Sequence, residues 1–100
     1  MKERVALVTG ASSGIGAATA ELLAREGAVV AVVARRADRL EDLVKRIQAA
    51  GHRAAAYPAD IAREPEARKV VADVLAHHGR IDILVNSAGI VRPGSVETGT

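Results

Sequence analysis

The stretch Thr9-Gly10-Ala11-Ser12-Ser13-Gly14-Ile15-Gly16 decides the fold of this chain. It follows the apolar run at residues 5–8 and opens a segment with helical periodicity, so its glycines stand where a strand turns into a helix. Backbone N–H groups come closest to a phosphate where no Cβ intervenes, and a helix N-terminus presents unpaired donors. The pattern therefore predicts a strand–turn–helix unit that binds a phosphate or pyrophosphate.

Each glycine of this stretch has an expected role. We expect Gly10 to form the tight turn, Gly14 to allow a pyrophosphate to approach the backbone, and Gly16 to bring the helix close to the strand. The alternative is a loop rich in glycine and serine that binds nothing. The succession of strand, glycines and helix disfavours that alternative.

The rest of the chain continues the same alternation. Apolar runs at 28–34, 53–57 and 81–85 predict further strands, and the first of them, apolar throughout, is typical of a strand buried on both faces of a sheet. The order βαβαβαβ with short loops predicts a Rossmann-type doubly wound α/β fold, with parallel strands in the order 3-2-1-4. We expect a single domain over residues 1–100, ending in a loop at 91–100.

Three helices are expected between these strands, ending at Gly27, Gly51 and Gly79. Asp38 and Glu41 resemble a capping box at the start of the second helix, and Pro65 suits the first turn of the third. The expected buried stripes are Ile15, Ala18, Leu22 and Leu23 in the first helix, Leu40, Leu43, Val44 and Ile47 in the second, and Ala67, Val70, Val71, Val74 and Leu75 in the third.

Composition excludes several classes of protein. The 100 residues contain no cysteine, which excludes a disulfide scaffold and a thiolate-rich metal site. The net charge of +2 is spread over the chain and no apolar run is long enough to span a membrane, so we expect no nucleic-acid or membrane partner and a cytoplasmic location. His52, His77 and His78 lack metal-ligand spacing, and we expect the last two to point to different faces of a helix end.

Two arginines follow the second strand, where NAD-binding proteins of this fold carry an acidic residue. Arg35 and Arg36 can bind a 2′-phosphate through charged, bidentate hydrogen bonds, whereas a carboxylate would repel it. The sequence therefore predicts NADP(H) rather than NAD(H), with either arginine able to dominate. The alternative is that both are solvated charges before a helix.

The order of these motifs resembles the short-chain dehydrogenase/reductase family. The glycine stretch, the arginines, Asp60 and the segment Asn86-Ser87-Ala88-Gly89 occur in the family's order, with Ser87 in place of an asparagine. The resemblance favours Arg35 for the phosphate, and implies that Asp60 binds the adenine amino group while Ile61 lines the same pocket. It also implies that Asn86 braces the sheet and that its segment contacts the adenosine and ribose. The alternatives are a turn cap for Asp60 and an ordinary polar turn for the last segment.

The predicted cofactor-binding residues are therefore Thr9, Gly10, Ser12, Ser13, Gly14, Ile15, Gly16, Arg35, Arg36, Asp60, Ile61, Asn86, Ala88 and Gly89. No catalytic residue is predicted, because the family's tyrosine and lysine, four residues apart, and its serine have no counterpart here: Tyr57 is followed four positions later by Ile61.

The resemblance implies the N-terminal, NADP(H)-binding part of an oxidoreductase that acts on a small carbonyl or alcohol. The chain alone is expected to bind cofactor without turnover, and the full-length form to be a homo-oligomer. The alternative is a self-sufficient, non-catalytic nucleotide-binding module.

Overall fold

Strands and helices alternate along the chain in the structure, a computed structural model that describes residues 4–11 and 14–86. The elements are β1 (Val5–Thr9), α1 (Gly14–Arg25), β2 (Val29–Ala34), α2 (Ala37–Ala49), β3 (Arg53–Pro58), α3 (Glu64–His78) and β4 (Ile83–Asn86). The predicted loop at 91–100 lies outside the described residues.

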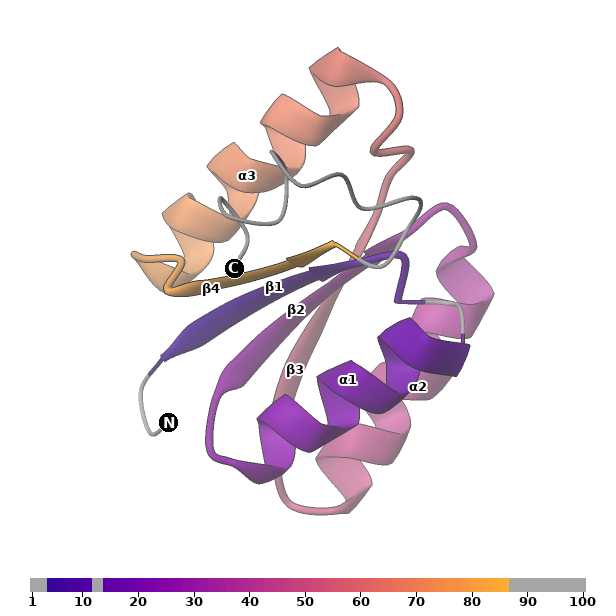
Figure 1. Ribbon diagram of the computed structural model, residues 1–100, viewed down its shortest axis with the longest axis vertical. Coiled ribbons are helices and arrows are strands. Elements are labelled where there is room, and N and C mark those ends of the chain that lie inside the picture. Colours follow the sequence, from indigo (N-terminus) through magenta and orange to yellow (C-terminus); the bar gives the residue numbers. More distant parts are fainter. Residues whose placement is uncertain (1–3, 12–13, 87–100) are drawn as a thin grey trace.

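The strands form one parallel sheet in the order β3-β2-β1-β4 (Figure 1). Val5 pairs with Val29 and Ala6 with Ile83, so β1 has a partner on each side. β2 likewise lies between β1 and β3, and five of its six residues are buried. The predicted Rossmann-type fold, its strand order and its interior second strand are confirmed.

Helices cover both faces of the sheet. Side chains alternate along the strands, so the apolar strands present apolar side chains on both faces. Figure 1 shows α1 and α2 on one face and α3 on the other. The first core contains Val8, Val30 and Val32 of the sheet, Ala20 and Ala24 of α1, and Leu40, Leu43 and Ile47 of α2. The second contains Val5, Leu7, Ala31 and Val33 of the sheet, and Val70 and Val74 of α3.

The buried face of α1 differs from the predicted stripe. Gly16, Ala20 and Ala24 are buried, whereas Ile15 and Leu22 are 76% and 51% exposed. The buried residues are four positions apart and small, which lets the helix axis come close to the sheet. The helical period was therefore predicted correctly, and Leu23 packs against the core as expected. Ile15, Ala18 and Leu22 were wrongly assigned to the face that contacts the sheet.

The stripe of α3 is narrower than predicted. Val70 and Val74 are buried, but Val71 and Leu75 are 40% and 45% exposed. Residues one position apart on a helix point about 100° away from each other. Because Val70 and Val74 face the sheet, the residues that follow each of them turn toward solvent. The helix ends as predicted at Gly79, whose positive φ of 84° suits glycine.

Two predicted boundaries also need correction. α2 begins at Ala37 with Arg36 at its N-cap and no side-chain cap bond, so Asp38 lies inside the first turn and forms no capping box. A capping side chain must precede the first helical residue. β4 begins at Ile83 rather than at residue 81. Just before it, the Asp82 carboxylate accepts a hydrogen bond from the Val5 N–H at 2.8 Å, and the Asp82 N–H donates to the Val5 carbonyl at 2.8 Å. Among the described helices, none is long and apolar enough to span a bilayer.

Candidate cofactor site at the carboxyl edge of the sheet

The carboxyl ends of all four strands meet at one edge of the sheet, because the strands are parallel. Backbone hydrogen bonds connect the loops there: the Ala11 N–H donates to the Val33 carbonyl at 3.0 Å, and the Ala59 N–H donates to the Ala34 carbonyl at 2.9 Å. The loops that follow β1, β2 and β3 are thus held next to one another. In open α/β sheets this edge is where ligands bind.

The glycine loop fits the approach of a phosphate. Gly10 has a positive φ of 68°, which gives the tight turn directly after β1. Among the described residues, no atom outside the adjacent chain and the helix's own backbone lies within 4 Å of a Cβ added to Gly14, so the first residue of α1 leaves room for a ligand. Gly16 is buried where α1 packs on the sheet. Ser12 and Ser13, which belong to the same predicted site, lie outside the described residues.

Thr9 and Asn86 connect the ends of the two strands beside this loop. The Thr9 hydroxyl lies 3.0 Å from Asn86 Oδ1 and 3.3 Å from the Val85 carbonyl, and Thr9 is only 5% exposed. Asn86 thus links β4 to β1. Ala88 and Gly89, with the rest of their predicted segment, lie outside the described residues.

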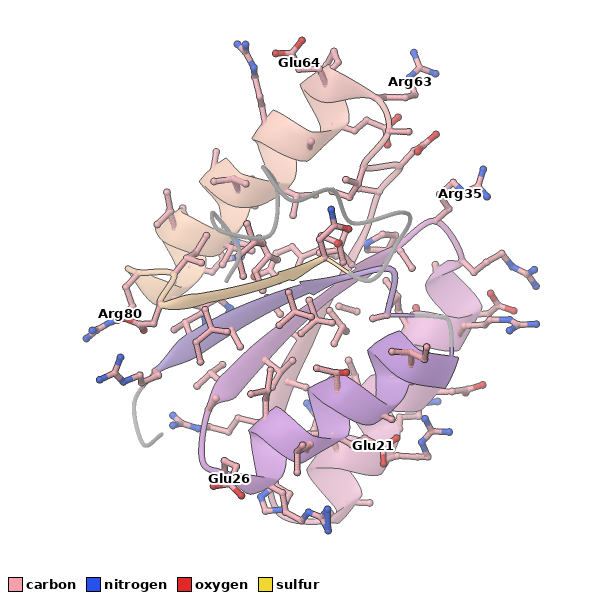
Figure 2. All side chains as sticks on the ribbon, viewed as in Figure 1. Glu21, Glu26, Arg35, Arg63, Glu64 and Arg80 are labelled. Atoms are coloured by element: carbon pink, nitrogen blue, oxygen red, sulfur yellow. The ribbon has the colours of Figure 1, made fainter. Side chains whose placement is uncertain are left out.

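The two arginines after β2 differ in their surroundings. Figure 2 shows the Arg35 side chain extending away from the sheet at the turn after β2. Arg36 instead donates to the Asp38 carboxylate at 3.4 Å, and both side chains are exposed. This hydrogen bond lowers the pKa of Asp38 from its ordinary value, so the carboxylate that accompanies Arg36 is ionised at neutral pH.

Asp60 forms a turn after β3. Its Oδ1 accepts a hydrogen bond from the Ala62 N–H at 3.0 Å, and its own N–H donates to Glu66 Oε1 at 2.7 Å. This is the turn-cap role left open by the sequence. Ile61, half-buried, packs against the core beneath α3. The turn brings Asp60 to the same edge as the glycine loop and the arginines.

A groove beside the glycine loop was not predicted from the sequence. It measures about 280 Å³ and lies between the loop, α1 and α2. Its lining residues are Ala11, Ala17, Arg39, Asp42, Leu43 and Arg46. Like Arg35 and Arg36, Arg39 is a basic residue that follows β2 closely, and this position could have indicated a phosphate ligand. It was overlooked because it falls inside a helix, where charged residues are usually solvated.

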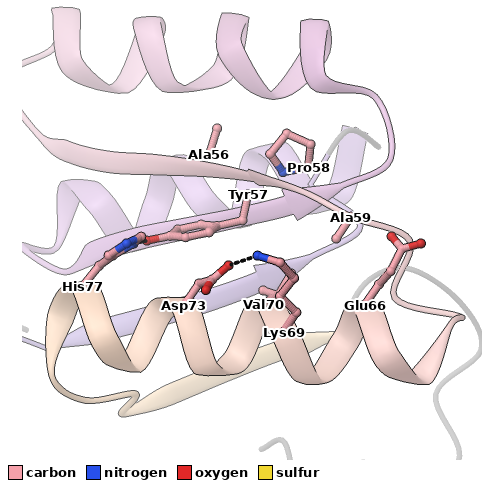
Figure 3. A pocket seen from close by; sticks show the side chains of 9 residues that line it. All are labelled: Ala56, Tyr57, Pro58, Ala59, Glu66, Lys69, Val70, Asp73 and His77. Atoms are coloured by element: carbon pink, nitrogen blue, oxygen red, sulfur yellow. Dashed lines mark hydrogen bonds and ion pairs between the residues drawn. The ribbon is translucent and has the colours of Figure 1, made fainter.

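A second unpredicted feature joins β3 to α3, away from the glycine loop. The Tyr57 hydroxyl lies 2.9 Å from His77 Nδ1 and 3.1 Å from His78 Nε2, so the two histidines do not point to different faces as expected. Figure 3 shows Tyr57 beside His77, above the Lys69–Asp73 ion pair of 3.1 Å. A cavity of about 320 Å³ lies there, and none of the predicted cofactor residues lines it.

The comparison with protein families identifies the family of the chain. The family model described as short chain dehydrogenase matches residues 4–100. The chain is 49% identical over 86 residues to an A-factor type gamma-butyrolactone 1′-reductase of Streptomyces virginiae, covering 86% of this chain and 34% of the relative. It is 40% identical to 2,3-dihydro-2,3-dihydroxybenzoate dehydrogenase of Bacillus subtilis, covering 95% of this chain and 36% of that enzyme. The chain spans about a third of the length of these relatives.

Solved structures agree with this assignment. A metagenomic short-chain oxidoreductase in complex with NADP superposes with a TM-score of 0.86 at 38% identity, over 94% of this chain and 47% of that one. L-sorbose reductase from Gluconobacter frateurii, complexed with NADPH and L-sorbose, gives a TM-score of 0.85 at 40% identity, over 92% of this chain and 35% of that one. With its glycine turn and its strand order, this chain belongs to the short-chain dehydrogenase/reductase family.

Proposed function

We propose that this chain forms the NADP(H)-binding part of an oxidoreductase that interconverts a small carbonyl compound and its alcohol. The observation that carries the proposal is the glycine turn between β1 and α1 at the carboxyl edge of the sheet. Gly10 has a positive φ of 68°, and among the described residues no atom outside the adjacent chain and helix backbone lies within 4 Å of a Cβ added to Gly14. A dinucleotide pyrophosphate needs such an approach to the backbone at the start of a helix.

Different described residues bind different parts of the cofactor. Gly10, Gly14 and the start of α1 bind the pyrophosphate through backbone N–H groups. Arg35, exposed at the end of β2, binds the 2′-phosphate, and Asp60 receives the adenine amino group. The Asp60 Oδ1 already accepts the Ala62 N–H, so this contact uses the remaining acceptor capacity of the carboxylate. Thr9 and Asn86 hold β1 and β4 together beneath the cofactor.

When bound, the nicotinamide supplies or accepts the hydride of the reaction. The described residues act on binding and orientation, and none of them is assigned a proton transfer. Reductases and dehydrogenases among the relatives, and the NADP and NADPH complexes among the similar structures, support the choice of reaction and cofactor. The substrate is proposed only as a small carbonyl or alcohol. The cytoplasmic location and homo-oligomeric state stay predictions.

Binding and activity are tested separately. NADPH and NADH are titrated separately into the chain, and calorimetry measures the affinity of each. We expect NADPH to bind at least tenfold more tightly than NADH. NADPH oxidation is then followed with a panel of carbonyl substrates, for this chain and for a longer protein that contains it and the family's tyrosine and lysine. Activity only in the longer protein supports the proposal. If both proteins bind NADPH but neither is active, a non-catalytic nucleotide-binding module is favoured. If neither protein binds NADPH, the proposal is refuted.

A further inference from the structure

We propose that Arg39, and not Arg36, is the second arginine that binds the 2′-phosphate beside Arg35. The inference rests on the proposed binding of NADP(H) and specifies which side chains select the phosphorylated cofactor. It comes from the groove between the glycine loop and α2, which brings Arg39 next to Ala11 and Ala17.

Arg36 is engaged by a carboxylate of its own helix. Its guanidinium donates to Asp38 at 3.4 Å, and both residues lie at the exposed start of α2. A 2′-phosphate that approached Arg36 would also approach the negative charge of Asp38. Like charges within a few ångströms repel each other, so the net attraction of this pair for a dianion is small.

Arg39 has a different environment. Within the part of the chain that the structure describes, neither Arg35 nor Arg39 has an acidic partner at ion-pair distance. Arg39 lies in the first turn of α2, four residues after Arg35, and lines the same groove as Ala11 of the glycine loop. Its guanidinium carries five N–H donors, enough to bind a phosphate bidentately. Arg35 and Arg39 therefore offer two guanidinium groups without an ion-pair partner among the described residues, one at the turn after β2 and one in the first turn of α2.

Two further groove residues make the inference testable. Asp42 lines the same groove, so its carboxylate opposes a phosphate bound to Arg39. Arg46 also lines it, but its guanidinium is bound to Glu21 of α1 at 2.9 Å. Asp42→Asn should therefore strengthen binding of the 2′-phosphate, whereas Arg46→Ala serves as a matched control that removes an arginine from the groove without removing a phosphate ligand.

The experiment measures the 2′-phosphate contribution directly, without activity. Adenosine 2′,5′-bisphosphate and adenosine 5′-monophosphate are titrated by calorimetry into the wild type and into Arg39→Ala, Arg36→Ala, Arg46→Ala and Asp42→Asn. We expect Arg39→Ala to weaken the bisphosphate about tenfold and to leave the monophosphate unchanged. Arg36→Ala and Arg46→Ala should change the bisphosphate less than threefold, and Asp42→Asn should strengthen it.

The outcomes separate this inference from the proposed function. If the wild type binds the bisphosphate no better than the monophosphate, the preference for NADP(H) is wrong and the role of Arg39 falls with it. If the wild type prefers the bisphosphate and Arg39→Ala keeps that preference, only the role of Arg39 is refuted. The same holds if Arg36→Ala weakens the binding of the bisphosphate as much as Arg39→Ala does. All the substituted residues are exposed or line the groove, and thermal unfolding verifies that each variant folds.

Discussion

The Thr9 hydroxyl lies 3.0 Å from the amide oxygen of Asn86, and this contact joins the carboxyl ends of β1 and β4. Asp82 performs a similar role at the amino ends, where its carboxylate accepts the Val5 N–H at 2.8 Å. The pair of strands beneath the glycine loop is thus held at both ends by side-chain hydrogen bonds. Since the loop begins directly after Thr9, this contact also positions the first turn of the proposed cofactor site.

Thr9→Val tests the contribution of this hydrogen bond. Valine keeps the shape of the buried side chain but removes the hydroxyl, so we expect the free energy of unfolding to fall by about 1 kcal/mol. Urea denaturation measures the loss. In an Asn86→Ala background the same substitution should cost clearly less, because only the more distant acceptor, the Val85 carbonyl at 3.3 Å, remains for the hydroxyl. Equal costs in the two backgrounds would show that the Thr9–Asn86 contact contributes nothing to stability.

Gly14→Val tests the glycine loop. Among the described residues, no atom outside the adjacent chain and helix backbone lies within 4 Å of the added Cβ, so we expect the thermal midpoint to stay close to that of the wild type. Dinucleotide binding should be lost, because the valine occupies the space proposed for the pyrophosphate. Calorimetry with NADPH measures the binding, and unaltered affinity would mean that the loop is purely structural.

Gly79→Ala is the matched control for that experiment. It too would place its Cβ in open space, but its φ of 84° strains any residue other than glycine. We expect this variant to lose about 1 kcal/mol of stability and to keep its affinity for NADPH. Gly14→Val should therefore lose cofactor binding but keep its stability, whereas Gly79→Ala should lose stability but keep cofactor binding.

The sequence predicted the fold well because its signals were local and repeated. The apolar run of β2, the glycine turn and the helix-ending Gly79 each specify one conformation, and together they leave little choice of topology. Which face of α1 is buried could not be predicted in the same way. The contact with the sheet selects small residues such as Ala20 and Ala24 over the larger Leu22, and that selection depends on the distance between helix and sheet.

The candidate site was predictable in part for a similar reason. The positions of Gly10, Gly14 and Arg35 follow from the strand ends, which the apolar runs mark. Arg39 and the Tyr57–His77–His78 cluster depend on which side chains of separate elements come together. No spacing along the chain encodes those contacts, so only the structure could reveal them.

Arg35→Asp tests the choice of cofactor. The exposed arginine after β2 is proposed to bind the 2′-phosphate, and a carboxylate there would repel it. We expect NADPH to bind at least about tenfold more weakly, a loss of about 1.4 kcal/mol, while NADH binds equally or more tightly. Fluorescence titration with both cofactors measures the change. An unaltered preference for NADPH would assign the phosphate to another residue, and Arg35→Lys should fall between the two because it keeps the charge but not the planar fork.

The partly buried position of His78 beside His77 at the end of α3 predicts a dependence of stability on pH. Burial lowers the pKa of His78 from its ordinary value of 6.5, and the neighbouring His77 lowers it further. The unfolded chain therefore binds the His78 proton more tightly than the folded chain, so stability is complete above pH 6.5 and falls as the pH drops from there towards the lowered pKa. We expect urea denaturation to show this loss as the pH falls below about 6.5, and His78→Asn to reduce it. His52→Asn is the matched control, because His52 lies in the loop before β3, away from Tyr57. A loss of the same size in His78→Asn as in the wild type would refute this role of His78.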